Sequence, residues 1–313
     1  MIDFRYHLVS IVSIFMALAV GIVLGAGPLK EDIGNTLTSE VKNLRADKAS
    51  LRSELDAAEK GTSARDEFTS ASNRSLLAER LKDTTVTLVV LPGADPNLVK
   101  STQGTLASAG AVVGSTISVQ DNWVDPEKAA FRATLGQQLA SQVGVPIDQS
   151  GSDVVDAVLA RSVLAKAGST AAGAASALEA MRTGDLIRYT PDNVKVASIA
   201  VVVAGPVTGS DATAREARAA GLSHLAGALD EAGAGAILVA ASLSPGATNT
   251  TSVVTTSRDD SDQSKVLSTV DDAELPMGQA SLVFGLLEQE AGKSGQYGLA
   301  SDATAAFPQL ATK

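Results

Sequence analysis

Few side chains in this sequence could support catalysis, because it contains no cysteine and only two histidines, His7 and His224. A serine hydrolase needs a nucleophile, a base and an orienting acid that converge in space. His224 follows Ser223 on a predicted helix, where adjacent side chains diverge. No GxSxG motif occurs, and the SxxK match at Ser39 and Lys42 falls on the outer face of a predicted stalk helix. The sequence therefore predicts a protein that is not an enzyme.

Soft metal ligands are also scarce. Cu(I) prefers thiolate or thioether ligands, and Cu(II) prefers imidazole. The four methionines lie far apart with no MxxM spacing, at Met1, Met16, Met181 and Met277. Two acidic stretches lack the ligand spacing of an EF-hand loop, and they comprise Asp259, Asp260 and Asp262, and Asp271, Asp272 and Glu274. We interpret them as solvated loop and helix-terminal charges and expect no bound metal.

A glycine-rich turn, VVVAGPVTGSD at residues 201–211, joins a predicted strand to a predicted helix. Such a turn can place a phosphate at the helix N-terminus. This one matches neither GxGxxG nor a P-loop, and Asp211 would repel a phosphate. We therefore expect a plain connection in which Asp211 caps the helix, and no cofactor.

The composition limits the classes of partner. The net charge is −10, the isoelectric point is about 4.7 and no basic run occurs, which argues against nucleic-acid binding. Aromatic residues make up only 3% of the 313 residues, so the core must consist of small aliphatic side chains.

Residues 8–27 form an uncharged stretch long enough to cross a bilayer as a helix. A cleavable signal peptide is the alternative, supported by the small residues GAG near its end. The leading MIDFRYH has one arginine offset by Asp3, and the apolar run is longer than a usual signal core. We predict an uncleaved transmembrane helix at 8–27 after a short tail at 1–7. Counting basic residues does not settle its orientation.

Small residues four apart lie on one face of this helix, at Ser13, Ala17, Gly21 and Gly25. Such a face lets two backbones approach closely, which drives helix association in lipid. Glycine and alanine are also common in membrane helices that have no partner. Ala17, Gly21 and Gly25 are the predicted transmembrane dimerisation residues.

The next segment, TSEVKNLRADKASLRSELDAAEK, has a heptad pattern. Its predicted core positions are Leu37, Val41, Leu44, Lys48, Leu51 and Leu55. In a parallel dimer the g residue of one chain meets the following e residue of the other, which pairs Glu40 with Arg45 and Asp47 with Arg52. Two chains anchored in one membrane require this parallel orientation. The sequence thus predicts a parallel coiled-coil homodimer.

An amphipathic helix packed on its own domain is the alternative to this coiled coil. Three heptads are marginal alone, but a shared anchor raises the local concentration of the partner helix. Pro28 and the glycines of GPLKEDIGN predict a break in the helix before the stalk. After Gly61 the register fails, and a shifted helical face carries Leu76, Leu77 and Leu81. We place the stalk at 36–82.

From residue 84 onward, strand-like runs alternate with helical ones. The predicted strands are 84–92, 111–119, 196–204, 235–242 and 265–270. Their near-continuous apolar character is typical of a parallel sheet covered on both faces. Helices are predicted at 95–109 and 211–232, each followed by a glycine, Gly110 and Gly233, suited to a left-handed cap. The fold class is α/β, with a Rossmann-like doubly wound domain at 84–313 and a helical insertion at about 125–184.

Two segments carry a resemblance to a known family. The opening RYHLVSIVSIFMALAVGIVLG and residues 268–289, STVDDAELPMGQASLVFGLLEQ, resemble the actinobacterial family named for mycobacterial copper transport protein B (MctB). Its corynebacterial SteB branch is associated with cell separation. The resemblance implies a cytoplasmic tail, one plasma-membrane span and an envelope-side domain.

Two functional hypotheses follow. One is a non-enzymatic homodimeric scaffold of the cell envelope. The resemblance to the SteB branch implies that such a scaffold links a cytoplasmic-side membrane partner to an extracytoplasmic peptidoglycan hydrolase in cell division. The other, implied by the family name, is a component of copper efflux or resistance. The scarcity of soft ligands favours the scaffold.

Overall fold

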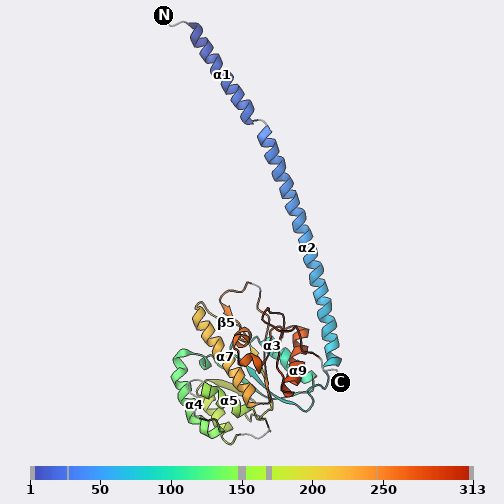
Figure 1. Cartoon of the computed structure of the whole chain (residues 1–313), viewed down its shortest axis with the longest axis vertical. Coiled ribbons are helices and arrows are strands. Elements are labelled where there is room, and N and C mark those ends of the chain that lie inside the picture. The colour runs from blue at the N-terminus through green and yellow to red at the C-terminus, as the bar shows by residue number, and fades with distance from the viewer. Residues whose placement is uncertain (1–3, 27, 147–152, 167–170, 245, 310–313) are drawn as a thin grey trace. The chain divides into compact units, whose positions relative to one another are not determined.

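A computed structural model describes residues 4–26, 28–146, 153–166, 171–244 and 246–309. The chain divides into two units, Met1–Arg65 and Asp66–Lys313. Figure 1 shows the course of the chain through both units.

The first unit is helical. Helix α1 spans Phe4–Ala26, and helix α2 starts at Pro28 and continues to Leu76. Proline suits the first position of a helix, because its missing N–H has no intrahelical partner there. The predicted break over GPLKEDIGN is therefore wrong for residues 28–35, which are helical. Gly27 lies outside the described residues.

The last turns of α2 belong to the second unit. Asn73 Nδ2 donates to the carbonyl oxygen of Pro276 at 2.7 Å. The prediction that Leu76, Leu77 and Leu81 share a helical face is wrong, because α2 ends at Leu76 and a turn follows. Leu77 and Leu81 are buried in the domain core, and the Leu81 N–H donates to Ala109 O at 2.8 Å. These leucines fasten the end of α2 to the domain.

A seven-stranded sheet forms the centre of the second unit, in the order β3-β2-β1-β4-β6-β8-β9. Its strands are β1 (Thr85–Val90), β2 (Val112–Val119), β3 (Ile187–Thr190), β4 (Ile199–Ala204), β6 (Ala236–Ala240), β8 (Ser268–Val270) and β9 (Gln296–Tyr297). All neighbours are parallel except β2 and β3. The five predicted strands are confirmed as β1, β2, β4, β6 and β8. The short β3 and β9, and the separate pair β5 (Val207–Thr208) and β7 (Thr250–Thr251), were not predicted.

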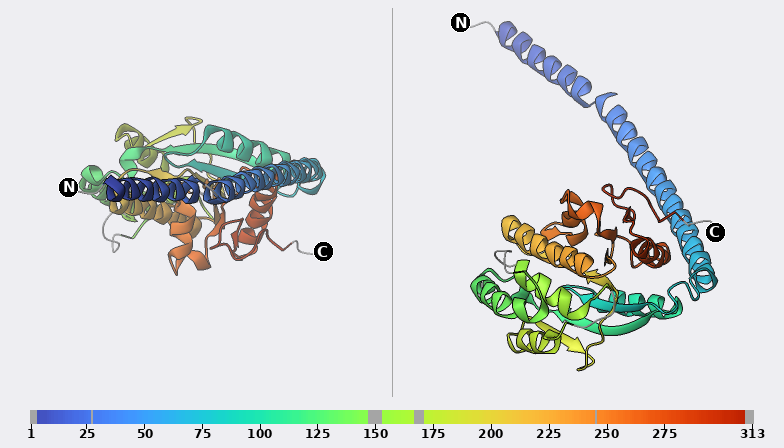
Figure 2. Two further views of the ribbon diagram at one scale, coloured as in Figure 1. Left: turned by 90° about the horizontal axis from the view of Figure 1, so that it is seen from above. Right: turned by 60° about the horizontal axis from the view of Figure 1, so that its bottom comes forward.

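Helices cover both faces of this sheet. Their bounds are α3 (Pro96–Ser108), α4 (Ala129–Val143), α5 (Asp153–Val163), α6 (Ala174–Thr183), α7 (Ala212–Ala232), α8 (Val253–Asp259) and α9 (Pro276–Glu290). Short 3₁₀ turns occupy Asp121–Trp123, Pro126–Lys128 and Gln263–Lys265. Figures 1 and 2 show α5 and α7 together on one side, and Figure 1 shows α3 and α9 on the other.

Two buried clusters result. One cluster contains side chains of the five helices α4, α5, α6, α7 and α8, which pack against strand side chains such as Val89, Val202 and Leu238. The other joins α3, α9 and the end of α2 with the alternate side chains, such as Leu88 and Val201. This alternation explains why the strands read as continuous apolar runs. The α/β class is confirmed, with a mostly parallel sheet.

Helix ends follow the capping chemistry only in part. Asp211 caps α7 by accepting from Ala214 N at 3.1 Å, as predicted. Gly110 has a φ of +87°, which confirms its left-handed conformation. Gly233 has a φ of −100°, so that prediction is wrong. A Cβ there would lie 2.7 Å from Ser198 O, so close packing explains the glycine.

The loops after β1 and β4 press together where the strand order changes direction. A Cβ on Gly205 would overlap the carbonyl group of Gly93, and the Leu91 N–H donates to Val203 O at 2.9 Å. In open α/β sheets this is the place where ligands bind. Here backbone from the two loops fills the space directly beside Gly205.

We predict that Gly205→Ala lowers the free energy of unfolding by about 3 kcal/mol, because the new methyl overlaps backbone that cannot move aside. Denaturant unfolding of the full chain in detergent measures this. The control is Gly104→Ala in α3, where nothing lies within 4 Å of the added Cβ. It should change stability by less than about 1 kcal/mol and in the stabilising direction. Equal effects would contradict the overlap.

Candidate functional site

An apolar stripe on the otherwise polar helix α2 is exposed in the described part of the first unit. The predicted core residues lie on one helical face at spacings of three and four. The apolar ones are 38–67% exposed, and they are Leu37, Val41, Leu44, Leu51 and Leu55. Isolated exposed leucines are ordinary, but a contiguous stripe marks an interaction surface.

A shallow groove lies along the middle of this stripe. It is lined by Leu44, Asp47, Lys48, Leu51, Arg52 and Leu55. The floor is therefore leucine, while the polar lining carries both signs of charge. Such a surface can receive the apolar side chains of another helix and pair with its charged flanks.

The four residues predicted to form interchain ion pairs are all exposed, namely Glu40, Arg45, Asp47 and Arg52. Within the described residues none of them forms an ion pair with its own chain. Their charged groups are therefore available to a partner. The structure contains a single chain, so the predicted pairings stay predictions.

The small-residue face of α1 is equally open. A Cβ on Gly21 or Gly25 would meet nothing within 4 Å, and Ala17 is exposed. Residues Phe4–Gly25 are long and apolar enough to cross a membrane, although a signal sequence at the N-terminus has the same properties. The structure thus places all three predicted residues on an unpartnered apolar helix.

Comparison with known proteins covers almost the whole chain. The family described as "Copper transport outer membrane protein, MctB" matches residues 1–308. The chain belongs to the MctB family. A protein named "Copper transporter MctB" from Mycobacterium bovis is 28% identical over 309 residues, covering 95% of this chain and 96% of the relative. One of the same name from Mycobacterium leprae is 26% identical over 318 residues, covering 97% and 98%.

The potential copper ligands of this MctB family chain are spread over four helices. Met181 is buried in the core, Met277 is half-buried on α9, His224 is exposed on α7, and Met16 and His7 lie on α1. Met1 lies outside the described residues. Among the described residues no group of three or more His, Cys, Asp or Glu side chains is arranged so that it could hold a metal ion.

An ion-pair network around Arg258 is a structural site that sequence reasoning missed. Arg258, buried on α8, donates to Asp271 Oδ2 at 2.6 Å and to Asp302 Oδ1 at 2.8 Å. It also donates to Thr269 Oγ1 at 2.8 Å and to Tyr297 O at 2.7 Å. Asp271 Oδ1 accepts further bonds from two backbone N–H groups after β9. The network ties β8, β9 and the C-terminal segment to α8.

Asp272, next to this network, is buried as well. Its two carboxylate oxygens have no hydrogen-bond partner among the described residues. Burial, followed by the nearby carboxylates of Asp271 and Glu274, raises its pKa to about 7. The expectation that Asp271 and Asp272 are solvated charges is therefore wrong, because the strand β8 carries them into the packed edge of the sheet.

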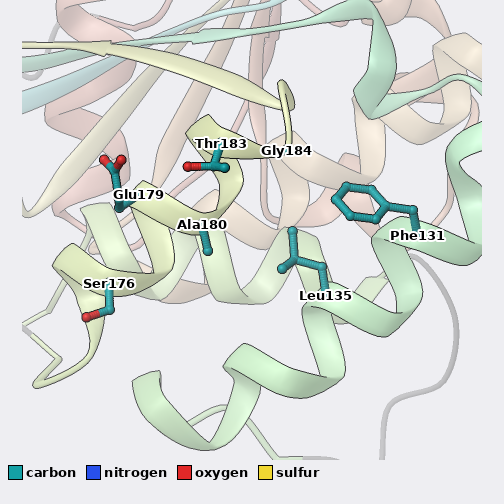
Figure 3. A pocket seen from close by; sticks show the side chains of 7 residues that line it. All are labelled: Phe131, Leu135, Ser176, Glu179, Ala180, Thr183 and Gly184. Atoms are coloured by element: carbon teal, nitrogen blue, oxygen red, sulfur yellow. The ribbon is translucent and has the colours of Figure 1, made fainter.

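A second groove lies on the helical layer, between α4 and α6 (Figure 3). Its lining consists of Phe131, Leu135, Ser176, Glu179, Ala180, Thr183 and Gly184. Glu179 is held by Arg182 at 2.8 Å, and the hydrogen bond from Arg182 lowers the pKa of Glu179. The lining therefore combines apolar side chains with the carboxylate of Glu179 and two hydroxyl groups.

We predict that Arg258→Met lowers the free energy of unfolding by about 3–5 kcal/mol, because it leaves Asp271 and Asp302 without their cation. Denaturant unfolding measures the loss. Limited proteolysis should then cut the segment after β9 first. Arg188→Met is the control, because Arg188 pairs with Asp185 at 3.5 Å on the surface. It should cost less than about 1 kcal/mol. A similar cost for both variants would contradict the role of the network.

Proposed function

We propose that this MctB family chain is a non-enzymatic, membrane-anchored scaffold of the cell envelope. In this proposal α1 spans the plasma membrane once and α2 pairs in parallel with a second copy. The Rossmann-like domain then lies on the extracytoplasmic side. The observation that carries the proposal is the exposed leucine stripe on α2.

The chemistry of the stripe supports a second copy as its partner. Removing aligned leucines from water is favourable by about 25 cal/mol per Å² of apolar surface. Parallel pairing sets Glu40 against Arg45 and Asp47 against Arg52, both attractive, whereas Glu54 meets Glu59 with repulsion. Lys48 at a core position weakens the pair but disfavours larger bundles.

The apolar α1 supports the same arrangement. Three heptads are marginally stable on their own. Two chains inserted in one membrane face each other at a high local concentration, which strengthens the pairing without any new contact. The small residues Ala17, Gly21 and Gly25 allow the two spans to approach closely.

The partners follow from the resemblance to the SteB branch. It implies a membrane or cytoplasmic-side partner at one end and a cell-wall hydrolase at the other, in cell separation. Exposed apolar faces on α1 and α2 are consistent with a protein that acts by contact.

A copper role is the second proposal, because the relatives are named copper transporters and the family description includes copper transport. Within the described residues of one chain, the thioethers lie on separate helices, and only His7 shares a helix, α1, with a methionine, Met16. A copper site would therefore need ligands from more than one chain or from another protein.

We predict that single cysteines replacing Leu44 or Leu51 form disulfide-linked dimers in isolated membranes upon mild oxidation, because core residues of a parallel pair face their own counterparts. The chain has no other cysteine. Non-reducing electrophoresis measures the yield. Lys42→Cys and Ser53→Cys, on outward positions, serve as controls and should react several-fold less. Equal yields at all four positions would contradict the coiled coil.

We predict that Leu51→Glu separates the two stalks, since two buried like charges cost about 3–5 kcal/mol. Cells carrying only this variant should form chains with incomplete separation, while copper tolerance stays normal. Microscopy and growth on graded copper measure the two outcomes. Ser53→Glu adds the same charge on the outward face and should leave separation normal. Normal separation with Leu51→Glu, despite lost crosslinking, would contradict the scaffold.

The same growth assay tests the copper proposal with Met277→Leu combined with His224→Ala. Met181 is kept, because it is buried and its replacement would disturb the core. Copper sensitivity with normal separation would favour copper handling over the scaffold.

A further inference from the structure

The strongest unexplained feature of the domain is a pair of buried polar groups beside the start of α9. Asp272 is fully buried, and neither carboxylate oxygen has a hydrogen-bond partner among the described residues. Ser281 on α9 is also fully buried, and its hydroxyl has no partner in the same part of the chain. Leaving such groups unpaired is costly, so a folded protein that keeps them needs a physical reason.

The start of α9 offers hydrogen-bond donors to this carboxylate. The first N–H groups of a helix have no acceptor within the helix, and no side chain caps α9 at Leu275. A Cβ on Gly278 would overlap the backbone carbonyl group of Asp272 and would lie 2.7 Å from Asp272 Oδ1, so both the main chain and the carboxyl group of Asp272 rest against the first turn. Gly278 is thus the residue that lets the two approach.

The same turn of α9 holds the end of α2. Asn73 Nδ2 donates to Pro276 O, and Pro276 is the first residue of α9. Upstream, the Leu275 N–H donates to Asp272 O at 2.9 Å. Any movement of residues 272–278 is therefore transmitted directly to Asn73.

We propose that Asp272 is a proton-dependent switch. When its carboxyl group is neutral, α9 stays docked and Asn73 stays bound to Pro276. When the carboxyl group is ionised, it draws the first turn of α9 toward itself, and the bond from Asn73 is released. In the neutral state the carboxyl tolerates its buried position, because an uncharged acid is far cheaper to bury than an anion. After ionisation it needs donors, and the free N–H groups of α9 together with the Ser281 hydroxyl can supply them.

The surrounding charges set the range in which the switch operates. Burial and the carboxylates of Asp271 and Glu274 disfavour ionisation of Asp272, whereas the nearby backbone N–H of Asp272 itself and the charge of Arg258 favour it. Asp302 is bound to Arg258, while Arg74 on α2 and Lys100 on α3 are exposed. The resulting pKa of about 7 lies in the range of pH that an extracellular surface meets.

The sign of the stability effect follows from this raised pKa. Between its ordinary value of 3.8 and about 7, the folded chain binds a proton that the unfolded chain has lost. The free energy of unfolding therefore falls as pH rises through this window and levels off above it. Asp272→Asn, which keeps the shape of the neutral acid, should remove this contribution.

Hydrogen exchange of the full-length chain in detergent micelles, corrected for intrinsic rates, tests the proposal between pH 5.5 and 8.5. Peptides covering residues 69–77 should exchange about tenfold faster at the higher pH, the effect of losing one hydrogen bond. The N–H groups at the start of residues 274–282 should exchange more slowly there, because ionised Asp272 accepts from them. In Asp272→Asn this acceleration should be absent. Asp192→Asn, which removes an exposed carboxylate, should behave like the wild type.

Asn73→Ala separates the switch from a general loss of stability. In this variant residues 69–77 should exchange fast at every pH, while residues 274–282 should still respond to pH. Should Asp272→Asn fail to fold, the proposal is tested by comparing the pH dependence of exchange at residues 69–77 in the wild type and in Asn73→Ala. A wild type without pH dependence at 69–77, or a dependence that persists unchanged in Asp272→Asn, overturns the proposal. It does not rest on dimerisation, so failure of the crosslinking experiment leaves it standing.

Discussion

The two faces of the parallel sheet must both be covered, and much of the domain follows from that requirement. Strand β4 is buried along its whole length, so its backbone and side chains depend on helices from both sides. Helices α5 and α7 cover one face, whereas α3 and α9 cover the other. Because the chain has few aromatic residues, each side chain buries only a small apolar area. The sheet therefore needs helices on both faces to remain stable.

This cover also determines how the long helix is attached. Leu77 and Leu81, which follow α2, belong to the same buried cluster as α3 and α9. The end of α2 is thus part of the domain core and is not joined to it by a free linker. The Asn73 contact with Pro276 adds a polar tie at the same place. A force or rearrangement in the last turns of α2 therefore acts directly on α9, next to Asp272.

The two halves of the chain carry different kinds of functional information. The first unit exposes apolar side chains that water disfavours, which points to partners for α1 and α2. In the second unit the turn beside β4 is filled by backbone around Gly93 and Gly205. Membership of the MctB family connects the chain to proteins named copper transporters, and the proposed assembly rests on the exposed helix faces.

Patterns within single segments were sufficient for much of the prediction. Heptad spacing identified an apolar stripe along α2, continuous Val and Ile runs identified five of the strands, and Asp211 identified the start of α7. These features depend on neighbours in sequence, since helix periodicity and capping are local. The break before the stalk was misplaced, because proline at the first position of a helix is compatible with helix.

The sequence by itself therefore determined the apolar N-terminal helix, the amphipathic stripe of α2 and the α/β class. Only the tertiary structure decided that Asp271 binds Arg258 while the buried carboxylate of Asp272 has no hydrogen-bond partner among the described residues. The two carboxylates are adjacent in the chain, so no local pattern distinguishes them. Their environments differ because Arg258, Tyr297 and Gly278 come from other elements, and burial and pairing depend on contacts between distant parts of the chain.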